Sequence, residues 1–246
     1  MDRSLYVGMT GASQILQAQA VQAQNLANVS TAGFRADLYA FQATPIAGPG
    51  FATRVNAVAQ NSGFSSATGA LSQTGSPLDV AVRGDGWLAV QAKDGSEAYT
   101  RAGDMHLTPD GLLVTATGLP VLGDGGPISV PPSDNVIVGT DGTITVIPQG
   151  VGPKGAGPVG RLKLVNPPTA QLVKGPDGLM RLRDGTTAPS DSKVQVESGT
   201  LESSNVNAPR ALVEMIELSR LFDMQTRLMN STDQNEQAAQ KLLAPS

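Results

Sequence analysis

The two ends of the chain carry the same apolar spacing, and this repeat constrains the fold more than any other feature. Near the N-terminus, seven positions, six of them apolar, are separated by alternating steps of four and three residues: Leu5, Met9, Ala12, Leu16, Gln19, Ala23 and Leu26. The same steps recur in the C-terminal segment at Ala211, Met215, Leu218, Phe222, Gln225, Met229, Thr232, Glu236, Ala239 and Leu243. Such spacing places residues on one face of a helix, as in a coiled-coil seam. The sequence therefore predicts two terminal helices that pair with each other.

The first of these helices is predicted to be surrounded by protein. From Ser4 to Phe34 the sequence contains no Asp, Glu, Lys, Arg or His. A helix exposed to water usually carries charges on its outer face, and charges are costly to remove from water. The uncharged composition therefore favours a buried environment, and an ordinary amphipathic helix in water is the alternative. The helix should end near Asn28, because Ser30, Thr31 and Gly33 are turn and capping residues.

Between the helices the sequence predicts an antiparallel β domain over residues 76–200. Short apolar runs there are separated by Asp-Gly pairs that begin at positions 85, 94, 110, 124, 141, 177 and 184. Asp-Gly favours tight hairpin turns, which need a positive φ angle. These pairs do not recur at the nine-residue period of calcium-binding β-rolls. The fold class is therefore mixed α and β, with a central and barrel-like antiparallel domain between two long helices.

Residues 35–75 show neither helical nor strand periodicity and are predicted to form an extended connector. Aromatic residues are spread along this part of the chain, at Phe34, Tyr39, Phe41, Phe51 and Phe64. They are expected either to anchor the segment on a neighbouring molecule or to make isolated contacts with the chain's own domain.

No catalytic, cofactor-binding or metal-binding site is predicted. The chain has no cysteine, its single histidine is His106, and no Gly-x-Ser-x-Gly motif is present. A Gly-x-Gly-x-x-Gly match at Gly150, Gly152 and Gly155 is interrupted by prolines and precedes no predicted helix, so it is not interpreted as a phosphate loop.

The composition also argues against two kinds of partner. The net charge is −4 and no basic run occurs, so a nucleic-acid partner is not expected. No stretch is apolar enough to span a bilayer or to form the apolar region of a cleavable signal peptide, so no direct membrane insertion is expected.

Three groups of motifs identify a family. Residues 25–35 resemble the signature of flagellar rod and hook proteins, with Asn25, Leu26, Ala27, Asn28, Thr31, Gly33 and Phe34 as its positions; residue 32, often proline in that family, is alanine. Residues 75–88, 99–103 and 110–114 resemble the start of the family's β domain. Near the second helix, Leu201, Glu202, Ser204, Asn205 and Val206 match the pattern Gly-x-Leu-Glu-x-Ser-Asn-Val.

This resemblance implies a structural subunit of the bacterial flagellar basal-body rod. Members of the family leave the cell through the flagellar type III export apparatus without a cleaved signal peptide. They stack with copies of themselves and with proximal and distal rod proteins into a hollow drive shaft across the periplasm. The resemblance places residues 1–34 and 201–246 in the inner tube. The seam there would consist of Leu5, Met9, Ala12, Leu16, Ala23, Leu26, Met215, Leu218, Phe222, Met229 and Leu243.

Within the family, the opening residues resemble most the proximal rod protein with a single β domain. The alternatives are a distal rod protein or, from a different class, a secreted β-rich binding module. The signatures lie at helix boundaries. Asn28 and Gly33 are expected to end the first helix in turn or left-handed conformations, and Phe34 is expected to anchor the chain beyond it. Ser204 or Asn205 is expected to cap the second helix.

Overall fold

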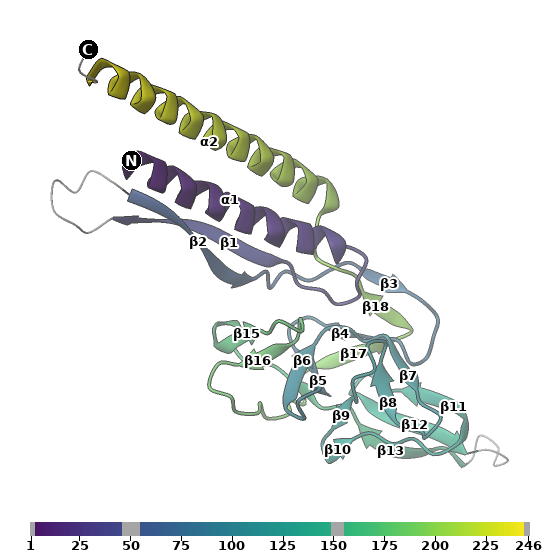
Figure 1. The fold of residues 1–246 in the computed structure, drawn as a ribbon. Helices are drawn as coiled ribbons and strands as arrows, with labels where there is room; N and C mark the ends of the chain where they lie inside the picture. Colours follow the sequence, from purple (N-terminus) through teal and green to yellow (C-terminus); the bar gives the residue numbers. More distant parts are fainter. Residues whose placement is uncertain (1–2, 46–54, 149–154, 244–246) are drawn as a thin grey trace. The chain divides into compact units, whose positions relative to one another are not determined.

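A computed structural model of the protein describes residues 3–45, 55–148 and 155–243, and its elements are labelled in Figure 1. The chain forms two compact units. The helical unit contains Met1–Asn28, Ala36–Ser65 and Val206–Ser246, whereas the β unit contains Val29–Arg35 and Ser66–Asn205. The chain therefore passes between the units after residues 28, 35, 65 and 205.

The helical unit contains both predicted helices. Helix α1 spans Arg3–Ala27 and helix α2 spans Ala208–Leu243. The two helices lie side by side and antiparallel (Figure 1): Gln22 donates a hydrogen bond to Glu214 (2.6 Å), whereas Gln225 donates one to the carbonyl of Gly8 (3.2 Å). The prediction that the terminal helices pair is confirmed.

The N-terminus of α2 corrects the predicted cap. The side-chain oxygen of Asn207 accepts a hydrogen bond from the backbone N–H of Arg210 at 3.0 Å, which is the geometry of an N-cap. The helix begins one residue after Asn207, so Ser204 and Asn205 lie too far upstream to reach its free N–H groups. The Asn205 side chain instead donates to the carbonyl of Ala67 at 2.8 Å.

A long hairpin occupies much of the segment for which the sequence predicts a connector. Strand β1, Asp37–Pro45, pairs antiparallel with strand β2, Val55–Phe64, and packs along α1 (Figure 1). The rings of Tyr39 and Phe41 meet edge to face, with centroids 5.7 Å apart. Most β1 side chains are exposed, so no alternation of apolar and polar residues marks this hairpin in the sequence.

The spacing of four and three residues describes α2 better than α1. On α2 the predicted face points inward, because Ala211 and Leu218 are buried and Met215, Phe222 and Met229 are partly buried. The side chain of Leu243 lies outside the described residues.

On α1 the buried side of the helix consists mainly of small and polar residues: Gly8, Ala12, Ala18, Gln22 and Asn25. Of the predicted seam only Ala12 is buried; Leu5 and Leu26 are partly buried, and Met9, Leu16 and Ala23 are exposed. Small residues allow close approach: a Cβ added to Gly8 would lie 2.8 Å from Cγ of Met229.

The β unit is built from short antiparallel strands around one apolar core. The strands are β3 Leu71–Gln73, β4 Val80–Arg83, β5 Trp87–Gln91, β6 Glu97–Thr100, β7 Met105–Leu107, β8 Leu113–Thr115, β9 Leu122–Gly123, β10 Gly126–Pro127, β11 Ser133–Val138, β12 Thr143–Pro148, β13 Gly157–Arg161, β14 Leu164–Val165, β15 Leu172–Lys174, β16 Met180–Leu182, β17 Gln195–Ser198 and β18 Thr200–Glu202. The largest sheet has the order β14-β5-β6-β16-β15. Val80, Val90, Leu113, Val121 and Ile144 lie in the core.

The predicted antiparallel β domain is confirmed, and the turn chemistry explains its hairpins. Five Asp-Gly pairs connect strands that pair with each other: β5–β6, β7–β8, β9–β10, β11–β12 and β15–β16. The described strands pair in several separate sheets, and no single closed barrel is formed by the pairings among them.

Three further observations concern features for which no functional role is predicted: the single histidine, the glycine-rich match and a membrane-spanning helix. The exposed side chain of His106 lies on β7. Gly150 and Gly152 of the glycine-rich match lie outside the described residues. Within the described part of the chain, neither helix combines the length and apolarity needed to cross a bilayer.

Replacing Gly8 and Gly11 separately by alanine tests the close approach of the two helices. Alanine favours a helix over glycine by about 0.8–1 kcal/mol at either position. A Cβ at Gly11 would have its nearest neighbour at 3.6 Å, so Gly11→Ala should stabilise the helical unit. A Cβ at Gly8 would press on Met229, so Gly8→Ala should lose most or all of that gain. Denaturant unfolding followed by far-UV circular dichroism measures the difference; equal stabilisation by both changes would contradict the close packing.

Candidate functional site

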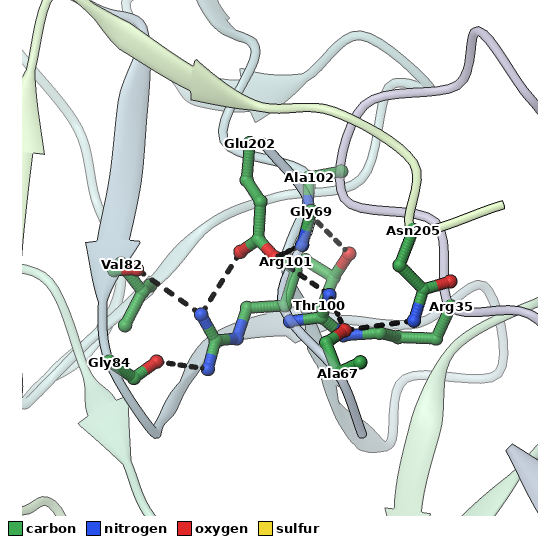
Figure 2. Close-up of polar contacts among 10 residues, drawn as sticks. All are labelled: Arg35, Ala67, Gly69, Val82, Gly84, Thr100, Arg101, Ala102, Glu202 and Asn205. Carbon is green, nitrogen blue, oxygen red and sulfur yellow. Dashed lines mark hydrogen bonds and ion pairs between the residues drawn. The ribbon is translucent and has the colours of Figure 1, made fainter. Parts of the chain in front are cut away.

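Three charged side chains are buried together in the β unit (Figure 2). Arg35, Arg101 and Glu202 are only 2%, 3% and 1% exposed, and we call them the junction cluster. One carboxylate oxygen of Glu202 lies 2.7 Å from Nη1 of Arg35, and the other lies 3.0 Å from Nη1 of Arg101. The backbone N–H of Gly69 also donates to the carboxylate, at 2.8 Å. Both oxygens of this buried anion are therefore compensated.

The two guanidinium groups are held by backbone carbonyls and one indole ring. Arg101 donates to the carbonyls of Val82 (3.2 Å) and Gly84 (2.6 Å), and Arg35 donates to that of Ala67 (2.7 Å). The guanidinium carbons lie 5.8 Å (Arg35) and 5.4 Å (Arg101) from the centroid of the Trp87 ring. Cation–π attraction is strongest where water is excluded, so Trp87 helps to balance two cations that share one anion.

Burial changes the pKa of one member of the cluster. It lowers the pKa of the Arg101 guanidinium from its ordinary value, and the neighbouring Glu202 carboxylate opposes that change. Among the described residues, the Nε atoms of Arg35 and Arg101 are buried without a hydrogen-bond partner. Removing one partner from such a cluster leaves an uncompensated buried charge or group, which is costly.

Backbone hydrogen bonds join the two signatures beside this cluster. The N–H of Gly33 donates to the carbonyl of Glu202 at 2.7 Å, and the N–H of Asn205 donates to the carbonyl of Phe34 at 3.2 Å. Gly33 has a φ angle of 66°, and a Cβ there would lie 2.1 Å from the carbonyl carbon of Arg101. Glycine is therefore required both by conformation and by space.

Lys174 on β15 holds the same segment from another side. Its ammonium group donates to the carbonyl of Arg35 at 2.8 Å and lies 4.1 Å from the centroid of the Phe34 ring. Phe34 is therefore anchored by a cation–π contact inside the β unit of its own chain.

The first half of the N-terminal signature acts in the helical unit. The buried side chain of Asn25 donates to the carbonyl of Asp37 (2.9 Å) and accepts from the N–H of Asp37 (2.8 Å), so it binds the start of β1 to α1. The Asn28 side chain donates to the carbonyl of Gln24 at 2.9 Å, close to the end of α1. No non-glycine residue in the described ranges has a positive φ, so Asn28 does not adopt a left-handed conformation; Gly33 does.

The structure brings together only part of the predicted signature. Gly33, Phe34, Glu202 and Asn205 meet beside the junction cluster. Leu26, Leu201 and Val206 are partly buried, Ser204 is buried, and Ala27 and Thr31 are exposed. Sequence reasoning gave no role to Arg35, Arg101, Trp87 or Lys174. The sequence has 17 Lys and Arg residues, and their types and spacing do not indicate which are buried.

The described residues contain no group of three or more His, Asp or Glu side chains placed to hold a metal ion. An open pocket of about 470 Å³ lies elsewhere in the β unit, among loop residues between Asn166 and Ser192. Proline and hydroxyl side chains line most of it, together with Asp184 and Asp191.

Comparison with known families covers most of the chain in order. Residues 5–35 match the family "Flagella basal body rod protein", residues 81–146 match "Flagellar hook protein FlgE/F/G D1 domain", and residues 197–242 match "Flagellar basal body rod FlgEFG protein C-terminal". The chain is 44% identical to the flagellar basal-body rod protein FlgF of Salmonella typhimurium over 252 residues, which covers 100% of both chains.

Two further relatives also match this chain over nearly its whole length. The FlgF protein of Escherichia coli is also 44% identical over 252 residues, with both chains covered fully. The flagellar basal-body rod protein FlgG of Buchnera aphidicola is 30% identical over 264 residues, covering 97% of this chain and 99% of the relative.

Replacing Glu202 by glutamine tests the junction cluster. Glutamine keeps the shape but leaves two buried cations without an anion, so the free energy of unfolding of the β unit should fall by about 3–5 kcal/mol. The matched control is Glu197→Gln, because Glu197 pairs with Arg83 at 3.6 Å on the surface, where loss of an ion pair costs about 0–1 kcal/mol. Urea unfolding followed by the fluorescence of Trp87, the only tryptophan, measures both. Similar losses in the two variants would contradict this account of the cluster.

Proposed function

The chain belongs to the family of flagellar basal-body rod proteins and is a structural rod subunit of the proximal type, and from this premise we propose how it assembles. Copies pack helically with one another and with other proximal and distal rod proteins into the hollow shaft that transmits torque. Residues 1–34 and 201–246 form the inner tube, and residues 76–200 form the outer domain. We place the β1–β2 hairpin with the inner tube, because it packs on α1 in the helical unit.

One observation carries this proposal: α2 exposes large apolar side chains that its own chain does not cover. They are Leu212, Val213, Ile216, Leu221, Met224 and Leu228, each between 44% and 59% exposed. The other side of the helix already packs against α1. Large apolar side chains exposed in this number on one helix favour an interaction site over singly scattered surface residues. A neighbouring subunit that covers it supplies the burial the lone chain lacks.

The outer side of α1 gives independent support. Tyr6, Met9 and Leu16 are each about half exposed, at 56%, 55% and 49%. The exposed polar residues between them, such as Gln17 and Gln24, are uncharged. An uncharged outer face suits a helix that is enclosed by neighbouring subunits, since no charge then has to leave water.

Charges on α2 fit a role in choosing partners. Glu217, Arg220, Asp223 and Arg227 are exposed, alternate in sign along the helix and have no net charge together. Charges arranged to complement those of a partner add specificity more than raw affinity. They favour a neighbour whose charges alternate in the complementary order.

The remaining features of the proposal rest on family membership. The subunit leaves the cytoplasm through the flagellar type III export apparatus without a cleaved signal peptide and works in the part of the basal body that crosses the periplasm. It acts as a structural protein and not as an enzyme. A distal rod protein is the less favoured alternative, because the two relatives that are 44% identical over the whole chain are both FlgF proteins.

Replacing Met224 by glutamate tests the outer face of α2. Met224 is 57% exposed, so the lone subunit should fold normally, whereas a charge facing a neighbour should block assembly. Counting basal bodies and measuring motility in cells that express and export the variant tests this. Gln195→Glu, at an exposed site of β17, is the control and should leave the rods intact. Normal rods with Met224→Glu would show that this face stays in water.

Replacing Gln17 by glutamate tests the uncharged face of α1. Gln17 is exposed in the lone chain, so the change should alter its folding free energy by no more than about 0.5 kcal/mol. In a tube wall the charge would be buried in every copy, and an unpaired buried charge costs several kcal/mol. Rod counts should therefore fall while the melting temperature of the purified subunit stays unchanged. Full rod counts would leave the uncharged composition without this explanation.

A further inference from the structure

We propose that the junction cluster is an anchor that brings α1 and α2 together, so that the pairing of the two helices depends on Arg35. This inference concerns the single chain and does not rest on the assembly proposed above. It assigns to the two signatures a role in positioning the helices.

The helical unit is assembled from pieces that are far apart in the sequence. Helix α1 and the hairpin hold each other, because both strands pack on α1 and the side chain of Asn25 binds the backbone of Asp37. Helix α2 is a separate piece, and nearly the whole β unit lies between it and the hairpin in the sequence. Without a link through the β unit, the two pieces would meet only by a costly loop closure.

The junction cluster provides this link, close to the points where the chain leaves α1 and the hairpin and where it enters α2. After α1, the short segment Val29–Arg35 enters the β unit, and Asn205 is the last residue of the β unit before α2. The carbonyl of Phe34 accepts a hydrogen bond from the N–H of Asn205, so the segment that follows α1 and the segment that precedes α2 are joined there. We call these two segments the tethers. Ala67, which follows the hairpin, accepts from both Arg35 and Asn205. Three of the four points at which the chain passes between the units, after residues 35, 65 and 205, therefore lie next to these residues in the sequence, and the fourth begins the segment that ends at Arg35.

The tethers are short enough to confine the helices. Phe34 lies seven positions after the end of α1 at Ala27, and Asn205 lies three positions before the start of α2 at Ala208. At no more than about 3.5 Å per residue, the ends of the helices are kept within roughly 40 Å of each other. Confinement on this scale corresponds to an effective concentration in the millimolar range.

Confinement matters because the α1 side of the contact between the helices offers few large apolar side chains. That face is built largely from small and polar residues, and hydrogen bonds from Gln22 to Glu214 and from Gln225 to the carbonyl of Gly8 join it to α2. In proteins most helical stability comes from the packing of one face against a neighbour. Each helix therefore depends on the other, and their contact forms more readily when they are already held close together.

Arg35 is the part of the anchor that can be removed selectively. It carries the one large buried side chain of the segment Val29–Arg35. Its loss leaves Glu202 paired with Arg101, which is a neutral pair, whereas loss of Glu202 leaves two cations. Arg35→Met should therefore release the tether of α1 and keep the β unit folded.

The absence of cysteine makes the experiment direct. Ala20 on α1 and Ser219 on α2 are both exposed, so Ala20→Cys and Ser219→Cys can carry spin labels in the full chain. Double electron–electron resonance then gives the distribution of distances between the helices. The labelled parent should give a narrow distribution, and Arg35→Met should widen it by about twofold or more, as expected when a paired helix becomes a tethered one. The control Arg83→Met, which removes a surface ion pair at 3.6 Å, should leave it narrow.

Fluorescence of Trp87 shows whether the β unit remains folded in each variant. If Arg35→Met unfolds it, Lys174→Met decides the question, since that change removes the bond to the carbonyl of Arg35 without altering the buried charges. Lys174→Met should also widen the distribution, to a smaller extent. The proposal is overturned by a narrow distribution in Arg35→Met with a folded β unit. A narrow distribution in Lys174→Met, a broad one in the parent, or equal broadening in Arg83→Met overturns it too.

Discussion

A single buried carboxylate, that of Glu202, lies between two guanidinium groups, and three of the four points at which the chain crosses between its units lie within a few residues of its partners in the sequence. Arg35 comes from the N-terminal signature, Glu202 from the C-terminal one, and Arg101 from the end of a core strand of the β unit. A buried ion has to be compensated by partners of good geometry, so the three segments are required to meet in one arrangement. The backbone bonds of Gly33, Phe34 and Asn205 follow from that arrangement, as does the close fit at Gly33.

Several parts of the fold follow from local rules and are predictable from sequence. The C-terminal helix is one of them, because the spacing of four and three residues from Ala211 to Leu243 falls within α2, Ala208–Leu243. The Asp-Gly pairs predict the hairpins of the β unit, since a positive φ at the glycine is a local requirement. The face of α1 is different. It is chosen by the close approach of α2 at Gly8, so large residues such as Met9 and Leu16 are left outside, and a pattern based on apolarity selects the wrong side.

The hairpin and the junction cluster could not be predicted for a related reason. The hairpin has mostly exposed side chains on both faces, so the alternation that marks a half-buried strand is absent. Arg35 and Arg101 are far apart in the sequence, and only the folded chain shows that they share one carboxylate above Trp87. The family motifs contain both arginines but do not say what they contact. Long-range electrostatic compensation leaves no periodic signal in a single sequence.

The antiparallel order of α1 and α2 has a consequence for the field around the subunit. Each helix carries a macrodipole with its positive end at the N-terminus, and two antiparallel helices place opposite poles side by side. The macrodipoles of α1 and α2 therefore point in opposite directions and partly cancel, although α2 is the longer helix. The helical unit as a whole carries a smaller dipole than either helix would carry alone.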